Sequence, residues 1–314
     1  MLTRRHIRVK VLQSIYAYQN EHEANLQKQE KFLIYSMEQM HDLFLLMLDI
    51  MVQVQNHAES FMLKSQKKFL ATETDKKPNR KFVENRVLKQ ISDNKVLGDL
   101  KEQRNLTNWS EDNEYVHLLF KTLRESEMYH NYLSSQENSY QEDKAFVISF
   151  FKEIVAPNEK LYDYLEDKKL TWLDDFPIVN TAIVKSLEVL TPSLEDRKFI
   201  KKLYKNEDDK EFAIQLFRKT VLNNEKLEEE ISGKTPNWDR ERIAELDLIM
   251  IKMGLIEFMH FPSIPVKVTI NEYLEIAKEY STPKSSIFIN GILDKKVKDY
   301  TTTNKLNKIG RGLQ

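Results

Sequence analysis

The chain has 314 residues, of which 41% are hydrophobic, 31% are charged and only 6 are glycine. Because β-rich folds need many tight turns, and tight turns rely on glycine, this composition favours an all-α fold. The absence of cysteine excludes disulfides, thiolate metal sites and thiol nucleophiles. A net charge of −1 argues against a general nucleic-acid binder but permits a local basic site.

The sequence contains no pattern typical of an enzyme or of a membrane protein. It has no glycine-rich phosphate loop and no GxSxG, HExxH or CxxC motif, and its seven histidines lack metal-ligand spacing. No stretch approaches about 18 consecutive apolar residues, and no apolar signal-like run follows the first charges. We therefore expect a cytoplasmic protein with no enzymatic activity, no cofactor, no metal and no membrane contact.

A basic amphipathic helix is predicted at the N-terminus. Thr3 can cap a helix from Arg4 to Asn20, with an apolar stripe at Ile7, Val11, Leu12, Ile15 and Tyr18. Arg4 and Arg8 fall on the same stripe, so we expect the first turns to extend beyond the core and present cations to an anionic ligand. The free amides of the first turn would add to such a site. The alternative is a solvated basic terminus without a ligand.

The next part of the chain is predicted to be helical with polar interruptions. Residues 28–70 carry a long apolar pattern and form one helix or two stacked ones. Residues 71–80 read as a linker, and a short helix around 81–92 leads into a polar stretch that ends near Asn108. Another helix is expected from Ser110 to Leu133.

An internal repeat follows. The sequence DKAFVISFFKEIVAPNEKL, which begins at Asp143, aligns without a gap with DKEFAIQLFRKTVLNNEKL, which begins at Asp209, and the same offset of 66 residues pairs Trp172 with Trp238. We predict that segments 143–190 and 209–258 share one helix arrangement.

Three helices are expected after the second copy. Arg240 to Met259 is strongly apolar, which indicates a helix buried on most faces. Thr269-x-x-Glu272 has the pattern of a capping box and would open a helix that ends near Tyr280. Ser285 or Ser286 can cap the last helix, in which Gly291 is expected to permit close packing.

These last two helices carry the most specific pattern in the chain. The segments Ile264–Tyr280 and Ser285–Lys295 resemble the C-terminal signature of the NusB family, in which a "VP…V.INEA…LAK.F" helix precedes an "S..FVNGVLDK" helix. The matching residues are Pro265, Val266, Ile270-Asn271-Glu272, Ala277-Lys278 and Phe288-Ile289-Asn290-Gly291-Ile292-Leu293-Asp294-Lys295. At the other end of the chain, Arg4-Arg5-x-x-Arg8-x-x-Val11-Leu12-Gln13-x-Ile15-Tyr16 resembles the family's "RR..R..A(L/V)Q.LY" helix.

The resemblance implies a function. NusB proteins are all-α transcription antitermination factors that bind the boxA element of ribosomal RNA leaders together with the ribosomal protein NusE, as part of the RNA polymerase antitermination complex. Carried over, and with the neighbouring lysine of the basic helix included, the residues expected to bind RNA are Arg4, Arg5, Arg8, Lys10, Lys284, Ser285, Phe288 and Asn290. Arg8 could instead be a structural arginine packed at the helix end.

Two positions depart from the family pattern. A glutamate that commonly follows the third arginine is Val9 here, so Arg8 would lack a familiar ion-pair partner. The loop before the last helix, often acidic in the family, is Ser281-Thr-Pro-Lys284. This loss of negative charge would either strengthen the contact with RNA or indicate that the loop matches the family pattern in a different register.

The resemblance also predicts the domain organisation. Residues 1–25 and 207–300 would form a NusB-like helical bundle, and 26–206 a large helical insertion that contains the first repeat copy at 143–190. Residues 301–314 would be a basic, disordered tail. We expect the first copy to lack a boxA site. The alternative to an RNA-binding factor is a protein-only helical scaffold, in which the insertion binds partners and the RNA surface is vestigial.

Overall fold

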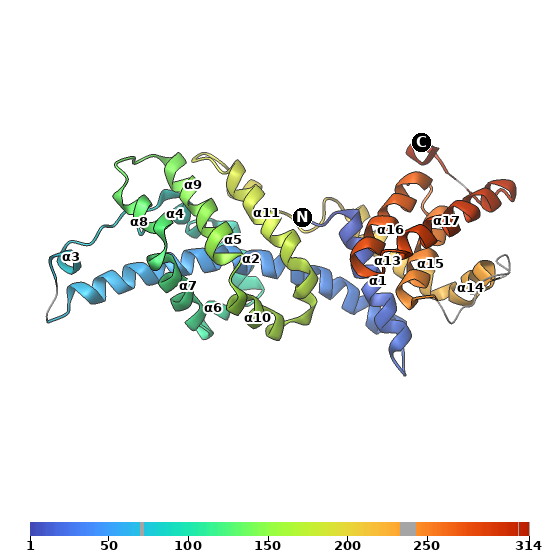
Figure 1. Ribbon diagram of the computed structural model, residues 1–314, viewed down its shortest axis with the longest axis horizontal. Helices are drawn as coiled ribbons and strands as arrows, with labels where there is room; N and C mark the ends of the chain where they lie inside the picture. The colour runs from blue at the N-terminus through green and yellow to red at the C-terminus, as the bar shows by residue number, and fades with distance from the viewer. Residues whose placement is uncertain (70–71, 233–242, 307, 314) are drawn as a thin grey trace. The chain divides into compact units, whose positions relative to one another are not determined.

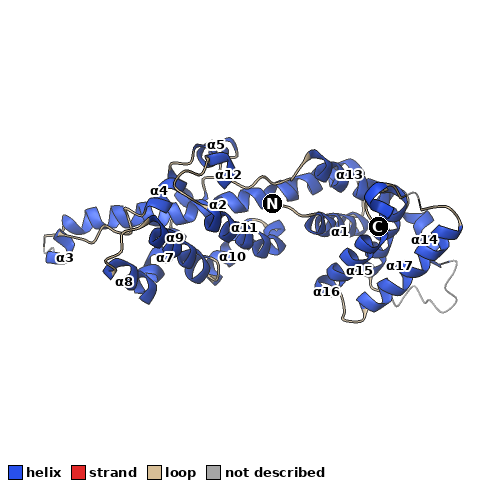
Figure 2. Cartoon of the chain, turned by 90° about the horizontal axis from the view of Figure 1, so that it is seen from above, coloured by secondary structure: helices blue, strands red, loops and turns tan. Residues whose placement is uncertain are grey.

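The computed structural model describes residues 1–69, 72–232, 243–306 and 308–313, and all regular elements in these ranges are helices (Figure 2). The predicted all-α fold is therefore confirmed. The chain divides into two compact units, unit 1 with Met1 and Glu38–Leu203, and unit 2 with Leu2–Met37 and Tyr204–Gln314. Within the described ranges, no helix combines the length and apolar character needed to cross a membrane.

One long helix, α2 (Leu26–Gln66), begins in unit 2 and continues into unit 1 (Figure 1). The other helices of unit 1 are α3 (Glu73–Lys76), α4 (Arg86–Ser92), α5 (Lys95–Gln103), α6 (Asn108–Glu111), α7 (Glu114–Glu125), α8 (Glu127–Ser134), α9 (Tyr140–Phe150), α10 (Glu159–Lys168), α11 (Phe176–Val189) and α12 (Asp196–Phe199). Unit 2 also has α1 (Arg4–Asn20), α13 (Glu207–Leu222), α14 (Asn224–Ser232), α15 (Glu245–His260), α16 (Val266–Tyr280) and α17 (Ser285–Thr302).

Unit 1 is built around α2, and residues 39–52 of this helix are all buried. Two indole groups fix neighbouring segments to its backbone. Trp109 Nε1 donates to the carbonyl oxygen of Leu46 at 2.9 Å, and Trp172 Nε1 donates to that of Gln39 at 2.7 Å. The two carbonyl groups are seven residues apart and so lie on one face, two helical turns from each other. Because a buried indole N–H needs an acceptor, these bonds set where each tryptophan can pack.

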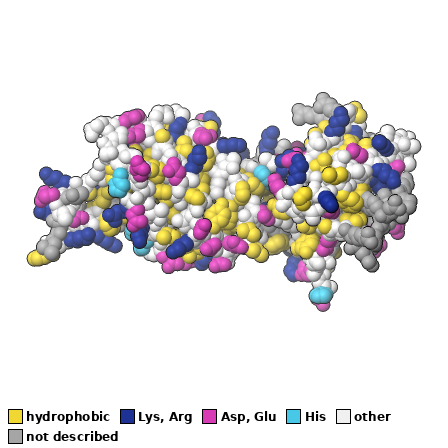
Figure 3. Space-filling view, viewed as in Figure 1, with side chains coloured by type: hydrophobic (Ala, Val, Ile, Leu, Met, Phe, Trp, Pro, Cys, Tyr) yellow, Lys and Arg dark blue, Asp and Glu magenta, His cyan; other side chains and the backbone are white. Residues whose placement is uncertain are grey.

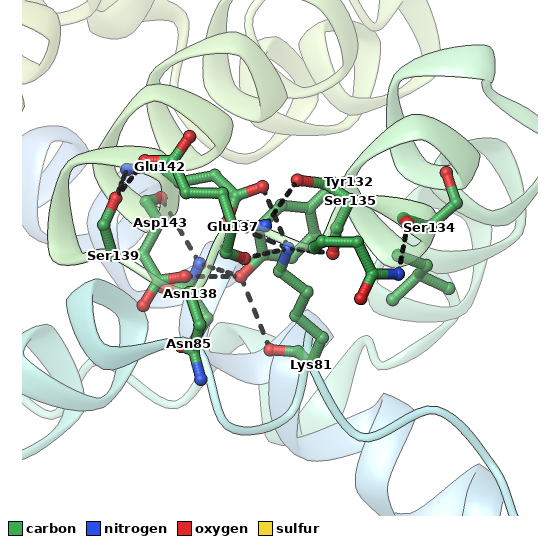
Figure 4. Close-up of polar contacts among 12 residues, drawn as sticks. Lys81, Asn85, Tyr132, Ser134, Ser135, Glu137, Asn138, Ser139, Glu142 and Asp143 are labelled. Carbon is green, nitrogen blue, oxygen red and sulfur yellow. Dashed lines mark hydrogen bonds and ion pairs between the residues drawn. The ribbon is translucent and has the colours of Figure 1, made fainter.

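A polar network joins the start of α4 to the end of α8 and the start of α9 (Figure 4). The Lys81 ammonium lies 4.7 Å from the ring centroid of Tyr132 and donates to Glu142 and to two carbonyl groups of the connecting loop. The Tyr132 hydroxyl donates to Asp143 Oδ1 at 2.7 Å, and Arg86 Nε donates to Asp143 Oδ2 at the same distance. Burial and the neighbouring Asp143 carboxylate raise the pKa of Tyr132, so its hydroxyl stays a donor.

In unit 2, α1 packs against α13, α15 and α16. Asn20 contacts Glu245 at the start of α15, and Arg8 contacts Glu257 near its end, so α1 and α15 are antiparallel. Helix α17 packs on both α15 and α16. A Cβ on Gly254 of α15 would lie 2.9 Å from a methyl carbon of Leu293, so this glycine permits the close approach of α17.

The structure corrects several local predictions. Gly291, predicted to permit close packing, faces open space. The Thr269 capping box is wrong: α16 begins one turn earlier, after Pro265, and Thr269 is buried inside it. The helix expected from Ser110 to Leu133 is interrupted at Ser126, whose hydroxyl accepts from the Tyr129 amide and caps α8. The first helix matches its prediction from Arg4 to Asn20, including the Thr3 cap.

Other predicted boundaries also shift. The linker at 71–80 contains the short helix α3, and the polar stretch before Asn108 contains α5. In the tail, α17 continues to Thr302, and the Lys308 ammonium donates to the carbonyl oxygens of Glu257 and Phe261, both at 3.0 Å. The described part of the tail is thus held against the end of α15, contrary to the expected disorder.

The repeat segments contain helices in the same order. In the first copy, α9 with its continuing turn at Phe151–Val155 is followed by α10 and α11, and in the second copy α13 is followed by α14 and α15. The matched aspartates have matched partners, since Asp143 binds Arg86 of α4 and Asp209 binds Arg4 of α1. Trp238 lies outside the described residues. The duplication, like the domain boundaries predicted with it, stays a prediction that these parallels support.

Replacing Trp172 with alanine should destabilise unit 1. The side chain is 1% exposed and its indole donates to Gln39, so the variant loses core volume and leaves a buried carbonyl group without this donor. A loss of about 3–5 kcal/mol in the free energy of unfolding is expected. Chemical denaturation followed by circular dichroism measures it, with Leu170→Ala at a 73% exposed neighbour as the control. Equal stability of the two variants would contradict the assignment of Trp172 to the core.

Candidate nucleic-acid interface

The start of α1 is fixed by its own first turn. The Thr3 hydroxyl accepts from the His6 amide, and the Thr3 amide donates to His6 Nδ1, each at 3.4 Å. Burial, together with the adjacent charge of Arg5, lowers the pKa of His6 to about 4. A neutral His6 keeps a lone pair on Nδ1 for this contact, which holds the N-terminal end of the helix in place.

A cleft of about 560 Å³ opens beside this helix end. It is lined by Thr3, Arg4, Arg5, His6 and Arg8 from the start of α1, and by Ser263, Ile264, Pro265, Val268 and Glu272 from the α15–α16 connection and the first turns of α16. One wall therefore carries arginines and the other is largely apolar. Such a combination can hold an anionic group on one side and a flat apolar group on the other.

Arg8 lies at the back of the cleft and is 1% exposed. Its Nε and Nη2 donate to the two carboxylate oxygens of Glu257, each at 2.7 Å, and Nη1 lies 3.5 Å from Glu272. Glu257 is fully buried and also accepts from the Thr269 and Tyr273 hydroxyls. Burial alone would lower the pKa of Arg8, but the charge and hydrogen bonds of Glu257 raise it above its ordinary value.

This arrangement corrects the prediction that Arg8 binds RNA. A guanidinium that is buried and doubly bonded to a buried carboxylate has no surface left for a phosphate, so Arg8 is structural. The first turns of α1 do not extend beyond the core at this position. Glu257 is thus the ion-pair partner of Arg8, in place of the glutamate that is common in the family where this chain has Val9. Lys10, another predicted RNA contact, is 3% exposed and is equally unsuited to the role.

Arg4 and Arg5 do reach the surface. Their side chains are 39% and 38% exposed. Arg4 Nε donates to Asp209 at 3.2 Å, and its guanidinium lies 4.9 Å from the ring centroid of Phe212. Arg5 donates to both oxygens of Glu272, each at 3.0 Å. Each arginine thus has a carboxylate partner. The partner reduces the net positive charge of the cleft, and it orients the guanidinium towards the cleft.

The remaining predicted residues lie at the start of α17. Lys284 is exposed. Asn290 is half-buried, and its Nδ2 donates to Asp294 at 3.1 Å. Phe288 is half-buried. Ser285 is 4% exposed, and its hydroxyl is within hydrogen-bond distance of Ser281 and Thr282, so it holds the loop together and is not free to contact RNA.

The structure therefore places the predicted residues in two separate groups. Arg5 meets α16 at Glu272 and Arg4 meets α13 at Asp209, whereas the start of α17 follows the C-terminal end of α16 at Tyr280. At a rise of 1.5 Å per residue, this interval of α16 alone is about 12 Å long. The two groups do not line the same cleft.

Sequence reasoning missed the three carboxylates that organise the cleft, which are Asp209, Glu257 and Glu272. One signal was available, because Glu257 interrupts the apolar run of the helix from Leu246 to Phe258. An acid in such a run must be paired, and an unassigned arginine is its natural partner. Lys252 in the same run shows the same rule, since it is 1% exposed and binds Glu228 at 2.7 Å.

Comparison with known proteins identifies a family for part of the chain. The sequence model of the NusB family matches residues 179–298. Proteins called transcription antitermination protein NusB from Salinibacter ruber and Methylacidiphilum infernorum are 41% and 39% identical to this chain, and one from Chloroherpeton thalassium is 36% identical. Residues 179–298 belong to the NusB family. The resemblance found in the sequence is thereby confirmed for this segment, which begins in α11, earlier than the predicted 207.

These NusB matches cover a limited part of each protein. They extend over 30–33% of this chain and over 65%, 66% and 49% of the Salinibacter, Methylacidiphilum and Chloroherpeton proteins, so the chain spans about half to two thirds of their length. No solved structure matches the chain. Among the described residues, no group of three or more histidine, aspartate or glutamate side chains could hold a metal ion.

The buried pair of Arg8 and Glu257 should dominate the stability of the NusB segment and α1. Arg8→Met leaves a buried carboxylate without its cation, so a loss of about 3–5 kcal/mol is expected. Arg8→Met combined with Glu257→Leu removes both charges and should recover most of that loss. Arg4→Met should cost less, at most about 1 kcal/mol, because the Arg4 side chain is 39% exposed and water screens its pair with Asp209. Urea denaturation of the four proteins measures these values, and similar costs for Arg8→Met and Arg4→Met would refute the structural role of Arg8.

Proposed function

We propose that this protein is a transcription antitermination factor that binds boxA-type RNA of ribosomal RNA leaders through the cleft at the start of α1. The observation that carries the proposal is the pair of half-exposed arginines, Arg4 and Arg5, on one wall of this cleft. Arginine is suited to phosphate because its planar guanidinium donates in pairs. The role of the protein is that of a binding factor rather than an enzyme.

The opposite wall supports recognition of single-stranded RNA. Ile264, Pro265 and Val268 line it, and Val268 is 44% exposed. Sequence-specific RNA recognition commonly uses unpaired bases that pack on flat apolar or guanidinium surfaces while the backbone contacts cations. A nucleotide in the cleft would place its phosphate towards Arg4 and Arg5, and its base against the apolar wall.

The function agrees with the names of the relatives, since all three are called transcription antitermination proteins. The partners proposed with it are NusE and the RNA polymerase antitermination complex. Two exposed arginines can neutralise only a few phosphates, so binding by the isolated protein should be weak. A partner protein that adds contacts to the same RNA would make the complex strong enough to act.

One observation favours the alternative of a protein-only scaffold. Arg4 and Arg5 both have carboxylate partners, and Arg8 is buried with a third. In a scaffold, these pairs would serve only to join helices. The two functions differ in what happens when one member of an exposed pair is replaced.

The Arg5–Glu272 pair provides this test. If Arg5 binds phosphate, Arg5→Ala should weaken boxA binding, whereas Glu272→Gln should strengthen it because the competing carboxylate charge is gone. If the pair only joins α1 to α16, both replacements should change the affinity for boxA RNA in the same direction. Fluorescence anisotropy with boxA and scrambled RNA measures affinity, and thermal unfolding checks that both variants fold.

Arg4 adds a second measurement. The Arg4→Ala and Arg5→Ala double variant should reduce the dependence of log affinity on log salt by about 1.4, at roughly 0.7 for each phosphate that an arginine no longer neutralises. Unchanged affinity and unchanged salt dependence in this variant would reject the cleft as the RNA site and favour the scaffold.

Partner binding is tested separately. Adding NusE should increase the affinity of the protein for boxA RNA, because the two proteins would contact the same RNA and each other. Isothermal titration calorimetry of the two proteins, with and without RNA, measures this coupling. Independent binding of NusE and RNA, with no change in either affinity, would contradict the proposed complex.

A further inference from the structure

A second concentration of positive charge lies in unit 1. Residues 64–81 contain seven lysines and arginines but only two acids, in a chain whose net charge is −1. Figure 3 shows dark blue side chains gathered over the end of α2 and over α3. The exposed cations here are Lys64, Lys67, Lys68, Lys76, Lys77 and Arg80, with Lys121 and Arg124 of the neighbouring α7. We refer to these eight residues, together with Phe61 and Phe69, as the basic end of unit 1.

Some of these cations are already paired. Lys76 binds Glu73 at 3.1 Å, and Arg80 binds Glu59 and Glu84 at 3.2 and 2.8 Å. In the described ranges, no ion pair involves Lys67, Lys68, Lys121 or Arg124. Apart from the attraction between Lys68 and the Asp75 carboxylate, these four side chains contribute excess positive charge, which attracts a polyanion over several ångströms.

An aromatic ring brings two of the four together. Lys68 Nζ lies 5.8 Å from the ring centroid of Phe61, and the Arg124 guanidinium carbon lies 4.5 Å from the same centroid. The two cations, one after the end of α2 and one on α7, are therefore within about 10 Å of each other. Like charges repel at this separation, and an anion between them would relieve that repulsion. The ring holds both cations at the surface rather than neutralising them.

A second aromatic side chain adds a different kind of contact. Phe69 follows Lys67 and Lys68 directly and is fully exposed to solvent. Exposed aromatics among cations are typical of single-stranded nucleic-acid sites, where bases stack on the ring and phosphates contact the cations. An acidic protein would use the charge but would gain nothing specific from an isolated phenyl ring.

We propose that the basic end of unit 1 is a second RNA-binding surface, which contacts the phosphates of single-stranded RNA and stacks a base on Phe69. The inference rests on the proposed RNA-binding function and extends it to a surface outside the NusB family segment. This surface also lies outside the first repeat copy at 143–190. Because backbone contacts carry no sequence information, it should bind RNA flanking boxA without base preference.

The test replaces the four unpaired cations in the full chain. The variant Lys67→Gln, Lys68→Gln, Lys121→Gln and Arg124→Gln is compared with the original protein by fluorescence anisotropy, using a 30-nucleotide single strand of mixed sequence. Affinity should fall at least tenfold at low salt, and the dependence of log affinity on log salt should decrease by about 2 to 3, at roughly 0.7 per phosphate neutralised. Phe69→Ala should lower affinity about tenfold without changing the salt dependence.

A matched control removes the same charge elsewhere in unit 1. Lys89, Lys152, Lys160 and Lys185 are exposed, and their replacement by glutamine changes the net charge by the same amount. This control should retain the affinity and most of the salt dependence. Equal losses in the two variants would mean that only net charge matters, and would overturn the inference.

The Arg4→Ala and Arg5→Ala background separates this surface from the cleft. Residual, salt-dependent RNA binding should remain in that background and disappear when the four cations are also replaced. If the four replacements have no effect while Arg4→Ala and Arg5→Ala weaken binding, the second surface is wrong and the proposed function stands. If only the four replacements weaken binding, the cleft is wrong and the second surface stands. Equal affinity for a polyglutamate peptide and for RNA of the same charge would overturn the choice of RNA.

Discussion

The buried ion pair between Arg8 and Glu257 is the contact on which the geometry of unit 2 depends. It joins residues 249 positions apart, and the carboxylate also accepts from Thr269 and Tyr273, so one group connects α1, α15 and α16. Removing two charges from water costs several kcal/mol each, and only good geometry with all hydrogen bonds made offsets that cost. The bidentate pairing and the two hydroxyl donors meet this condition. Any shift of α1 along α15 would break it.

The cleft follows from this constraint. With Arg8 fixed inside, the turn before it must lie at the rim, and Arg4 and Arg5 emerge there beside the α15–α16 connection. Their partners, Asp209 and Glu272, hold the two guanidinium groups in one orientation while more than a third of each side chain stays in water. A site built in this way is pre-organised, because its cations need not be ordered when a ligand arrives.

The two units use a similar contact in different places. In each of the two aligned segments, the aspartate near the start of the first helix binds an arginine from a separate helix, Arg86 in unit 1 and Arg4 in unit 2. The surroundings then differ. In unit 1, Tyr132 and Arg86 share Asp143, and Lys81 with Glu142 completes the closed network of Figure 4, whereas in unit 2 Arg4 remains at an open cleft. The same anchor can therefore support either a packed joint or a binding surface.

The sequence by itself determined the all-α class, the first helix from Arg4 to Asn20 with its Thr3 cap, and the NusB resemblance of the last helices, because these depend on composition, local periodicity and short motifs. Only the tertiary structure decided which cations lie at the surface, where they can contact a ligand. Arg4, Arg5 and Arg8 are alike in sequence, but Arg8 meets Glu257 from a helix far along the chain and is buried. Likewise, the sequence around Thr269 has the pattern of a helix cap. In the structure the helix begins earlier, after Pro265, and the Thr269 hydroxyl donates to Glu257. Burial and partner choice arise from contacts between distant segments, which no local pattern specifies.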